Sequence, residues 1–179
     1  VSAYQRAVDL GDVSSMFSLA EMLAAGDGVP VDFERARDLL VAAIAAGQEV
    51  EGSAALGNLY LEAAPPNRDP AAAVKAFEQA IALGDTTSMI ELAQILAAGT
   101  EVPMDFDRAR RLVEAAIAAG SARTGWRTLG DIYRDAGPDD RDLAMAAEAY
   151  QKAVDLGDNA SRISLGKILA ADDSVPGNF

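Results

Sequence analysis

Side chains that could perform chemistry are few in this chain of 179 residues. Histidine and cysteine are both absent, which removes the commonest general base, the usual metal ligands and the Ser/His and Cys/His nucleophile systems. Ser164 and Lys167 do spell S-x-x-K, the motif that carries the serine nucleophile of penicillin-recognising enzymes. Those enzymes also need S-D-N and K-T-G elements, which this sequence lacks. We therefore predict that the chain is not an enzyme, and keep Ser164 as the nucleophile of an alternative hydrolase.

Two polar patterns could hold a ligand, but each has a simpler structural explanation. Asp139, Asp140 and Asp142 form an acidic cluster without the D-x-D-x-D-G spacing or the bidentate Glu of a calcium loop, so a solvated turn with a helix N-cap fits it better. Asn159 opens a formal glycosylation sequon at a position where a helix should start. We predict no metal, no cofactor and no small-molecule substrate.

Composition indicates an all-helical protein. Half of the residues are apolar but only 6% are aromatic, so the core must be built mostly of Ala and Leu, as in closely packed helices. The net charge of −13 repels phosphate backbones and anionic headgroups, which argues against nucleic acid as a partner. The longest apolar run, residues 39–46, is too short for direct membrane insertion. The expected partners are one or more proteins.

The elements that must position any site are set by an internal repeat. Leu-Gly-Asp occurs at residues 10–12, 83–85 and 156–158, and "DFERAR" from Asp32 returns as "DFDRAR" from Asp105, always 73 residues later. Glycines recur every 36 or 37 residues within that period. They are Gly11, Gly47, Gly84, Gly120 and Gly157. The repeating unit is therefore about 36 residues long, and two kinds of unit alternate.

Each unit reads as a pair of helices. Aspartates at 32, 69, 105 and 142 are placed to cap the second helix of a pair, and the recurring glycines are placed to end it. Apolar residues between these marks follow the i, i+3, i+4, i+7 spacing of one helix face. First helices are predicted at 13–25, 49–62, 86–98, 122–135 and 159–171. Second helices are predicted at 2–10, 33–46, 70–83, 106–119 and 143–156.

The repeat unit resembles the Sel-1-like repeat family, which is related to tetratricopeptide repeats. The residues that carry the resemblance in one unit are Leu56, Gly57, Tyr60, Asp69, Ala73, Phe77 and Ala80. Their counterparts 73 residues later are Leu129, Gly130, Tyr133, Asp142, Ala146, Tyr150 and Ala153. The resemblance covers essentially the whole chain. It implies an all-α, right-handed superhelical α-solenoid of antiparallel helix pairs, with the first helices lining a concave face.

The same resemblance implies a non-enzymatic protein–protein interaction scaffold. In bacteria it suggests part of an envelope assembly such as exopolysaccharide (alginate) export, with a periplasmic or outer-membrane-associated location favoured over a cytoplasmic one. A periplasmic regulator of exopolysaccharide synthesis is an alternative. Some Sel-1-like proteins have been linked to penicillin recognition, which keeps the Ser164 hydrolase as a further alternative.

Candidate partner-binding residues lie where the first helices face the expected concave side. Most stand two positions before or after the recurring leucine, and apolar or Arg side chains on such a face can mark an interface. The predicted site comprises Phe17, Glu21, Asn58, Leu61, Ile90, Gln94, Arg127, Asp131, Arg134, Ile163 and Lys167. The alternative is that tight curvature buries Phe17, Ile90 and Ile163. Trp126 is expected in the contact between helices.

The domain organisation is predicted as one repeat domain. Its units are 1–11, 12–47, 48–84, 85–120, 121–157 and 158–179, of which the first holds only a second helix and the last only a first helix. The final segment "SVPGNF", 174–179, aligns with "GVPVDF" at 28–33, where a helix begins. We therefore expect the chain to be a fragment of a longer array. Leu165, Ile168 and Leu169 would then need a further helix for burial.

Overall fold

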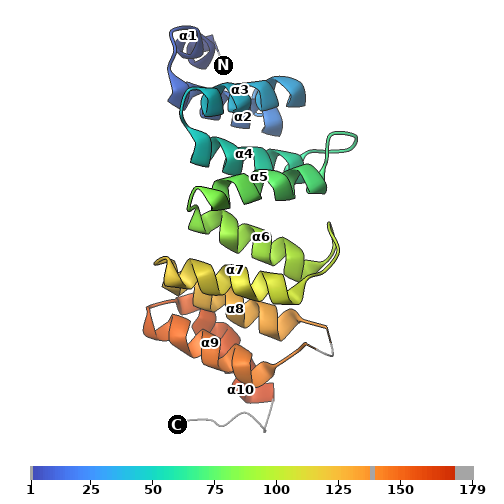
Figure 1. The fold of residues 1–179 in the computed structure, drawn as a ribbon, viewed down its shortest axis with the longest axis vertical. Helices are drawn as coiled ribbons and strands as arrows, with labels where there is room; N and C mark the ends of the chain where they lie inside the picture. Colours follow the sequence, from blue (N-terminus) through green and yellow to red (C-terminus); the bar gives the residue numbers. More distant parts are fainter. Residues whose placement is uncertain (1, 138–139, 172–179) are drawn as a thin grey trace. The chain divides into compact units, whose positions relative to one another are not determined.

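The computed structural model describes residues 2–137 and 140–171. Over those ranges the backbone forms ten α-helices and no strand, which confirms the all-α prediction (Figure 1). The helices are α1 (Ser2–Asp9), α2 (Val13–Ala25), α3 (Phe33–Ala45), α4 (Glu49–Glu62), α5 (Pro70–Ala82), α6 (Thr86–Ala98), α7 (Phe106–Ala118), α8 (Ala122–Asp135), α9 (Leu143–Asp155) and α10 (Asn159–Ala171). Every helix begins at its predicted residue. Asp139 and the predicted helix start at the end of 174–179 lie outside the described residues.

The helices are organised in two compact units. The first unit comprises residues 1–88 and the second comprises residues 89–179, so the boundary falls in the first turn of α6. Consecutive helices within each unit run antiparallel and are joined by short loops (Figure 1). No helix among the described residues combines the length and the apolar character needed to cross a membrane.

Aspartate caps fix the start of each second helix, as predicted. The carboxylate of Asp32 accepts a hydrogen bond from the Arg35 amide at 3.1 Å, and its own amide donates to the Leu23 carbonyl at 3.0 Å. The first bond satisfies a free amide of α3, and the second ties the cap to the last turns of α2. The same pair of bonds recurs at Asp69, Asp105 and Asp142. Each loop between paired helices is therefore closed at a fixed length.

The first helices start in two alternating ways, which the sequence analysis did not predict. In α2, α6 and α10 an aspartate accepts a hydrogen bond from the amide of a buried serine; the pairs are Asp12–Ser15, Asp85–Ser88 and Asp158–Ser161. In α4 and α8 the flanking residue makes no side-chain cap, and glycine replaces the serine. A Cβ on Gly52 would lie 2.4 Å from Cγ1 of Ile44. The glycine therefore permits the close approach of α3 and α4.

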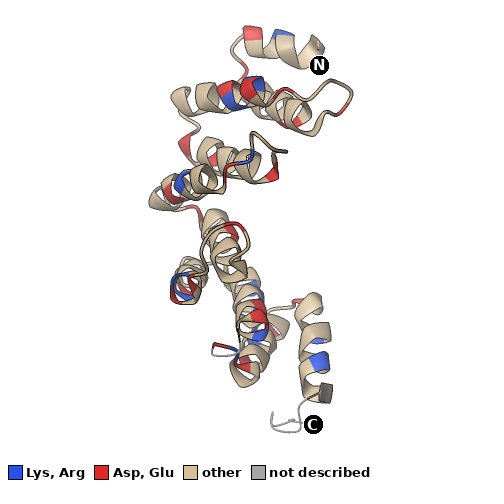
Figure 2. Cartoon of the chain, turned by 90° about the vertical axis from the view of Figure 1, so that its right-hand side faces the viewer, with Lys and Arg blue, Asp and Glu red and all other residues tan. Residues whose placement is uncertain are grey.

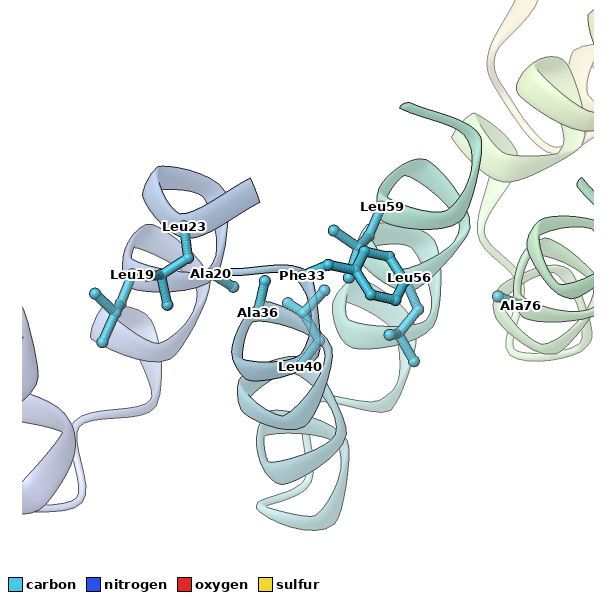
Figure 3. Packing of buried hydrophobic residues seen from close by; sticks show 9 residues of the cluster. All are labelled: Leu19, Ala20, Leu23, Phe33, Ala36, Leu40, Leu56, Leu59 and Ala76. Atoms are coloured by element: carbon cyan, nitrogen blue, oxygen red, sulfur yellow. The ribbon is translucent and has the colours of Figure 1, made fainter. Parts of the chain in front are cut away.

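The core of the first unit is a cluster of buried apolar residues contributed by α2, α3, α4 and α5 (Figure 3). Its members are Leu19, Ala20, Leu23, Phe33, Ala36, Leu40, Leu56, Leu59 and Ala76. Helices α4 and α5 approach closely at Gly57, where an added Cβ would lie 2.6 Å from the Phe77 ring. The small residues thus allow a mostly Ala and Leu core to reach full packing density.

A cluster of buried residues in the second unit lies between α9 and α10. Tyr150 is fully buried there, beside Ala146, Ala147 and Ile168. The expectation that Ile168 needs a further helix is wrong, because its side chain is only 5% exposed and packs against α9. Leu169, in contrast, is 40% exposed.

Candidate partner-binding site

The structure places the predicted site residues in different surroundings. Phe17, Asn58, Leu61, Arg127, Asp131 and Arg134 are half-buried, whereas Glu21, Gln94 and Lys167 are exposed. Ile90 is only 8% exposed, so the burial alternative holds for this residue. Ile163 is 65% exposed, so the same alternative fails for it. Equivalent repeat positions therefore differ in burial.

Three of the predicted residues meet in a groove between α2 and α4. A cavity of about 290 Å³ lies there, with a floor formed largely by Phe17, Ala20, Ala24, Ala55 and Leu59. Its polar lining consists of Glu21, Asn58 and Glu62. Leu61, also predicted for this face, does not line the cavity.

A second cavity, of about 610 Å³, continues the first toward the loops 26–32 and 63–69. The two cavities share four lining residues, Glu21, Ala24, Leu59 and Glu62. Val31, which is exposed, and Pro65 extend the apolar surface along this second part. The two cavities therefore form one groove, which we call the α2–α4 groove.

The polar side chains of the α2–α4 groove are free to accept a ligand's donors. Within the described ranges, Glu21, Asn58 and Glu62 have no hydrogen-bond or ion-pair partner. Glu21 and Glu62 are exposed at the rim, whereas Asn58 is half-buried. An apolar floor bordered by unpaired polar groups is the common arrangement of a protein-binding surface.

The positions 73 residues later form a different structure in the second unit. The Tyr150 hydroxyl donates to Asp131 Oδ1 at 2.7 Å and accepts from Arg134 Nη1 at 2.5 Å. Arg134 also pairs with Asp131 at 3.0 Å and with Asp135 at 2.5 Å. We call these four residues the α8–α9 polar cluster. Each of its charged and hydroxyl groups has a partner within the cluster, so it presents no unpaired acid to a ligand.

Electrostatics in the α8–α9 polar cluster follow from burial and from Arg134. Burial raises the pKa of Tyr150 well above its usual range, and the hydrogen bond to Asp131 raises it further. The hydrogen bond from Arg134 lowers the pKa of Asp135 despite partial burial. The cluster therefore holds a neutral Tyr150 phenol and an ionised Asp135 carboxylate beside the Arg134 guanidinium at neutral pH.

Arg127 and Trp126, the other notable side chains of α8, have structural partners. Arg127 Nη1 lies 3.4 Å from Oδ1 of Asp158, the residue that caps α10. Burial opposes the ionisation of Asp158, but hydrogen bonds from Ser161 and the nearby Arg127 outweigh it, so the Asp158 pKa is lowered. Trp126 is half-buried beneath Lys152 Nζ, which lies 4.3 Å from the ring centroid. Arg127 thus helps to hold α10 in place.

The S-x-x-K residues, Ser164 and Lys167, have different surroundings on α10. The half-buried Ser164 hydroxyl interacts with the Tyr150 phenol and so adjoins the α8–α9 polar cluster. Lys167 is exposed and makes no hydrogen bond to Ser164 in the part of the chain that the structure describes. Over the same part, acidic side chains nowhere gather in threes that could hold a metal ion.

Sequence reasoning missed Glu62 and Ala24, which line both parts of the α2–α4 groove. A usable signal exists for Glu62, because it follows Asn58 by four residues and so lies on the same helix face. Ala24 lies three residues after Glu21 on α2 for the same reason. Helical spacing from the predicted residues would have found both.

Antiparallel helix pairs that repeat every 73 residues, with an aspartate cap on each of α3, α5, α7 and α9, define an all-α repeat solenoid, and its first unit carries a groove between α2 and α4. The Sel1 repeat profile matches residues 13–48, 50–85, 86–121 and 129–158. The chain belongs to the Sel1 repeat family, whose members generally serve as protein-interaction scaffolds.

Solved structures of the same fold are similar over nearly the whole chain. A Sel1 repeat protein from Oxalobacter formigenes has a TM-score of 0.70 and 22% identity, over 98% of this chain and 74% of that one. A protective antigen present in uropathogenic Escherichia coli strains, which displays an SLR fold, has a TM-score of 0.69 and 23% identity over 94% of this chain. The chain spans only 36% of that antigen. Among proteins of curated function, no sequence matches this chain.

Proposed function

We propose that the chain is a non-enzymatic scaffold that holds a segment of a partner protein in the α2–α4 groove. The observation that carries this proposal is the groove itself, an apolar floor bordered by polar side chains, of which Glu21, Asn58 and Glu62 have no partner in the described part of the chain. A partner segment would bury the floor and satisfy the border at once. Because burial of apolar surface drives association, the floor supplies affinity and the border supplies orientation.

An exposed alanine in the groove offers a direct test. Ala24 lines both cavities and is exposed, so Ala24→Glu adds a charged side chain to the groove without disturbing the core. Ala42 is an exposed alanine on α3 that does not line the groove, so Ala42→Glu is the matched control. Proteins retained from native cells by the immobilised chain would be compared by mass spectrometry among the three forms.

We expect a partner that the unchanged chain and Ala42→Glu both retain and that Ala24→Glu loses. Circular dichroism should show the same helix content in all three forms, because both substitutions lie at exposed helix positions. Retention of one and the same set of proteins by all three forms would refute the groove as the binding site.

The proposal extends to a role in a bacterial envelope assembly such as exopolysaccharide (alginate) export, in the periplasm or at the outer membrane. Its support is the resemblance of the repeat units to Sel-1-like envelope scaffolds. Fractionation of the native cells should place the protein outside the cytoplasm, and deletion of its gene should block export of the polymer while synthesis continues. Reduced synthesis instead would favour the regulator alternative, and a cytoplasmic protein would contradict both.

The absence of a hydrolase activity is part of the same proposal. Its support is the contact of Ser164 with Tyr150 and the lack of a hydrogen bond between Ser164 and the exposed Lys167 in the described part of α10. A fluorescent penicillin should leave the folded chain unlabelled. Labelling that disappears in Ser164→Ala would contradict a purely non-enzymatic scaffold.

A further inference from the structure

The α2–α4 groove has a charge that its lining does not neutralise. Glu21 and Glu62 lie at its border, and no Lys or Arg is among the residues that line either cavity. The first unit as a whole contains 13 Asp and Glu but only five Lys and Arg. Figure 2 shows this excess of acidic residues along its helices and loops. The groove therefore repels acidic ligands and attracts basic ones.

In the second unit, the acidic side chains at the equivalent positions are neutralised by a cation that the chain itself supplies. Asp131 and Asp135 occupy the positions equivalent to Asn58 and Glu62, and both pair with Arg134. In the first unit Leu61 stands where Arg134 would be. The acceptors of α4 thus lack the guanidinium that satisfies their counterparts on α8.

We infer that the α2–α4 groove takes a protein segment that combines an apolar side chain with a neighbouring Lys or Arg. This inference rests on the function proposed above and specifies the chemistry of the partner. The apolar side chain covers the floor at Phe17, Ala20 and Leu59. The basic side chain lies against Glu21 and Glu62, with the half-buried Asn58 as a further acceptor. An Arg could bind such acceptors through two nitrogens at once, as Arg134 does.

Selection from a phage-displayed library of 12-residue peptides against the whole chain tests this inference. We expect enrichment of sequences in which Lys or Arg stands within one helical turn of a Leu, Ile or Phe. One selected peptide, made synthetically, would then be measured by calorimetry against variants. Glu21→Gln with Glu62→Gln should weaken its binding by about tenfold, because two partly exposed ion pairs are lost.

Two further variants sharpen the measurement. Leu61→Arg places a guanidinium where Arg134 stands in the second unit, and it should weaken the peptide by a similar factor because it competes for Glu62. Glu49→Gln with Glu51→Gln is the matched control, since it removes the same charge from exposed positions on α4 that do not line the groove. This control should bind within about twofold of the unchanged chain.

The outcomes separate this inference from the scaffold proposal. Peptides that lose affinity in Ala24→Glu but not in Glu21→Gln with Glu62→Gln would refute the basic partner and keep the groove. Enrichment of acidic or uncharged peptides at the groove would refute it in the same way. Peptides indifferent to Ala24→Glu, or a selection that returns no binder, would overturn both proposals.

Discussion

The pair α4 and α5, the first copy, and the pair α8 and α9, the second copy, share one packing design but differ in the polar side chains on the first helix of each pair. Both first helices place a glycine under a fully buried ring: Gly57 lies beneath Phe77 and Gly130 beneath Tyr150. The added Cβ would lie 2.6 Å from one ring and 2.7 Å from the other. The backbone packing is therefore the same, although one ring carries a hydroxyl and the other does not.

That hydroxyl distinguishes a helix pair whose polar side chains are paired from one whose polar side chains are not. The Tyr150 hydroxyl is hydrogen-bonded to Asp131 and Arg134, so these three side chains satisfy one another. Phe77 offers no such bond, and Asn58 on α4 has no hydrogen-bond partner among the residues that the structure describes. The comparison teaches that the repeat fixes the packing of a helix pair but leaves the chemistry of its exposed side free to vary.

Adding a methyl group beneath each of the two rings should have the largest effect on stability, and the size of the effect should differ between the two copies. Gly57→Ala and Gly130→Ala both force a ring to shift, which offsets the gain in helix propensity. Phe77 can shift without losing a hydrogen bond, whereas Tyr150 cannot. We expect destabilisation of about 2 kcal/mol for Gly130→Ala and about 1 kcal/mol for Gly57→Ala, measured by urea unfolding.

Gly166→Ala is the control for these two variants. A Cβ at Gly166 meets nothing within 4 Å, so this substitution should stabilise α10 by up to about 1 kcal/mol through helix propensity alone. Equal losses for Gly57→Ala and Gly130→Ala would show that the hydroxyl bonds of Tyr150 do not hold its ring.

Alkaline pH should weaken the second copy through Tyr150. Because folding raises the pKa of Tyr150, its contribution to stability is complete below the unfolded pKa of about 10 and is lost as the pH rises above that value. The unchanged chain should lose stability more steeply than Tyr150→Phe by about 1.4 kcal/mol per pH unit. Urea unfolding between about pH 9 and pH 11 measures this difference, and parallel curves for the two forms would contradict it.

Introducing Tyr at position 77 of the first copy should lower stability, unless the residues equivalent to Asp131 and Arg134 are introduced with it. Phe77→Tyr alone buries a hydroxyl beside Asn58 and Leu61, and we expect a loss of about 1 kcal/mol. Adding Asn58→Asp and Leu61→Arg supplies the partners that Tyr150 has, so the triple variant should regain most of that loss. Thermal unfolding of the single and triple variants tests this, with no recovery in the triple variant as the contrary result.

The helices were predictable from sequence because their signals are local. Asp32 and Asp69 mark helix starts by bonds to amides three residues away, and Gly120, with a φ of 106°, marks an end where other residues are strained. The α2–α4 groove and the α8–α9 polar cluster were not predictable in the same way. Tyr150 meets Asp131 across 19 residues, and Ile90 and Ile163 occupy equivalent positions yet differ in burial. Such differences depend on which neighbouring helix packs there, which a repeat pattern does not specify.

The smallest expected change in stability comes from removing the carboxylates at the ends of α4 and α8. It tests whether the carboxylate on α4, Glu62, is unpaired. Asp135 accepts two hydrogen bonds from Arg134, whereas Glu62 has no partner among the described residues. Asp135→Asn should cost about 0.5 kcal/mol, reduced by solvent exposure, and Glu62→Gln should cost almost nothing.

Acid should remove this small difference. Folding lowers the Asp135 pKa, so its contribution is present above the unfolded pKa of about 4 and disappears as the pH falls through the folded value. Asp135→Asn and the unchanged chain should therefore differ at about pH 7 and converge near pH 2.5. A larger cost for Glu62→Gln than for Asp135→Asn at about pH 7 would mean that Glu62 is already paired within the chain. The α2–α4 groove would then have no free carboxylate at Glu62 for a partner's cation. The contrast between an unpaired Glu62 and a paired Asp135 would fail, and the inferred binding of a basic side chain would lose one of its two carboxylates.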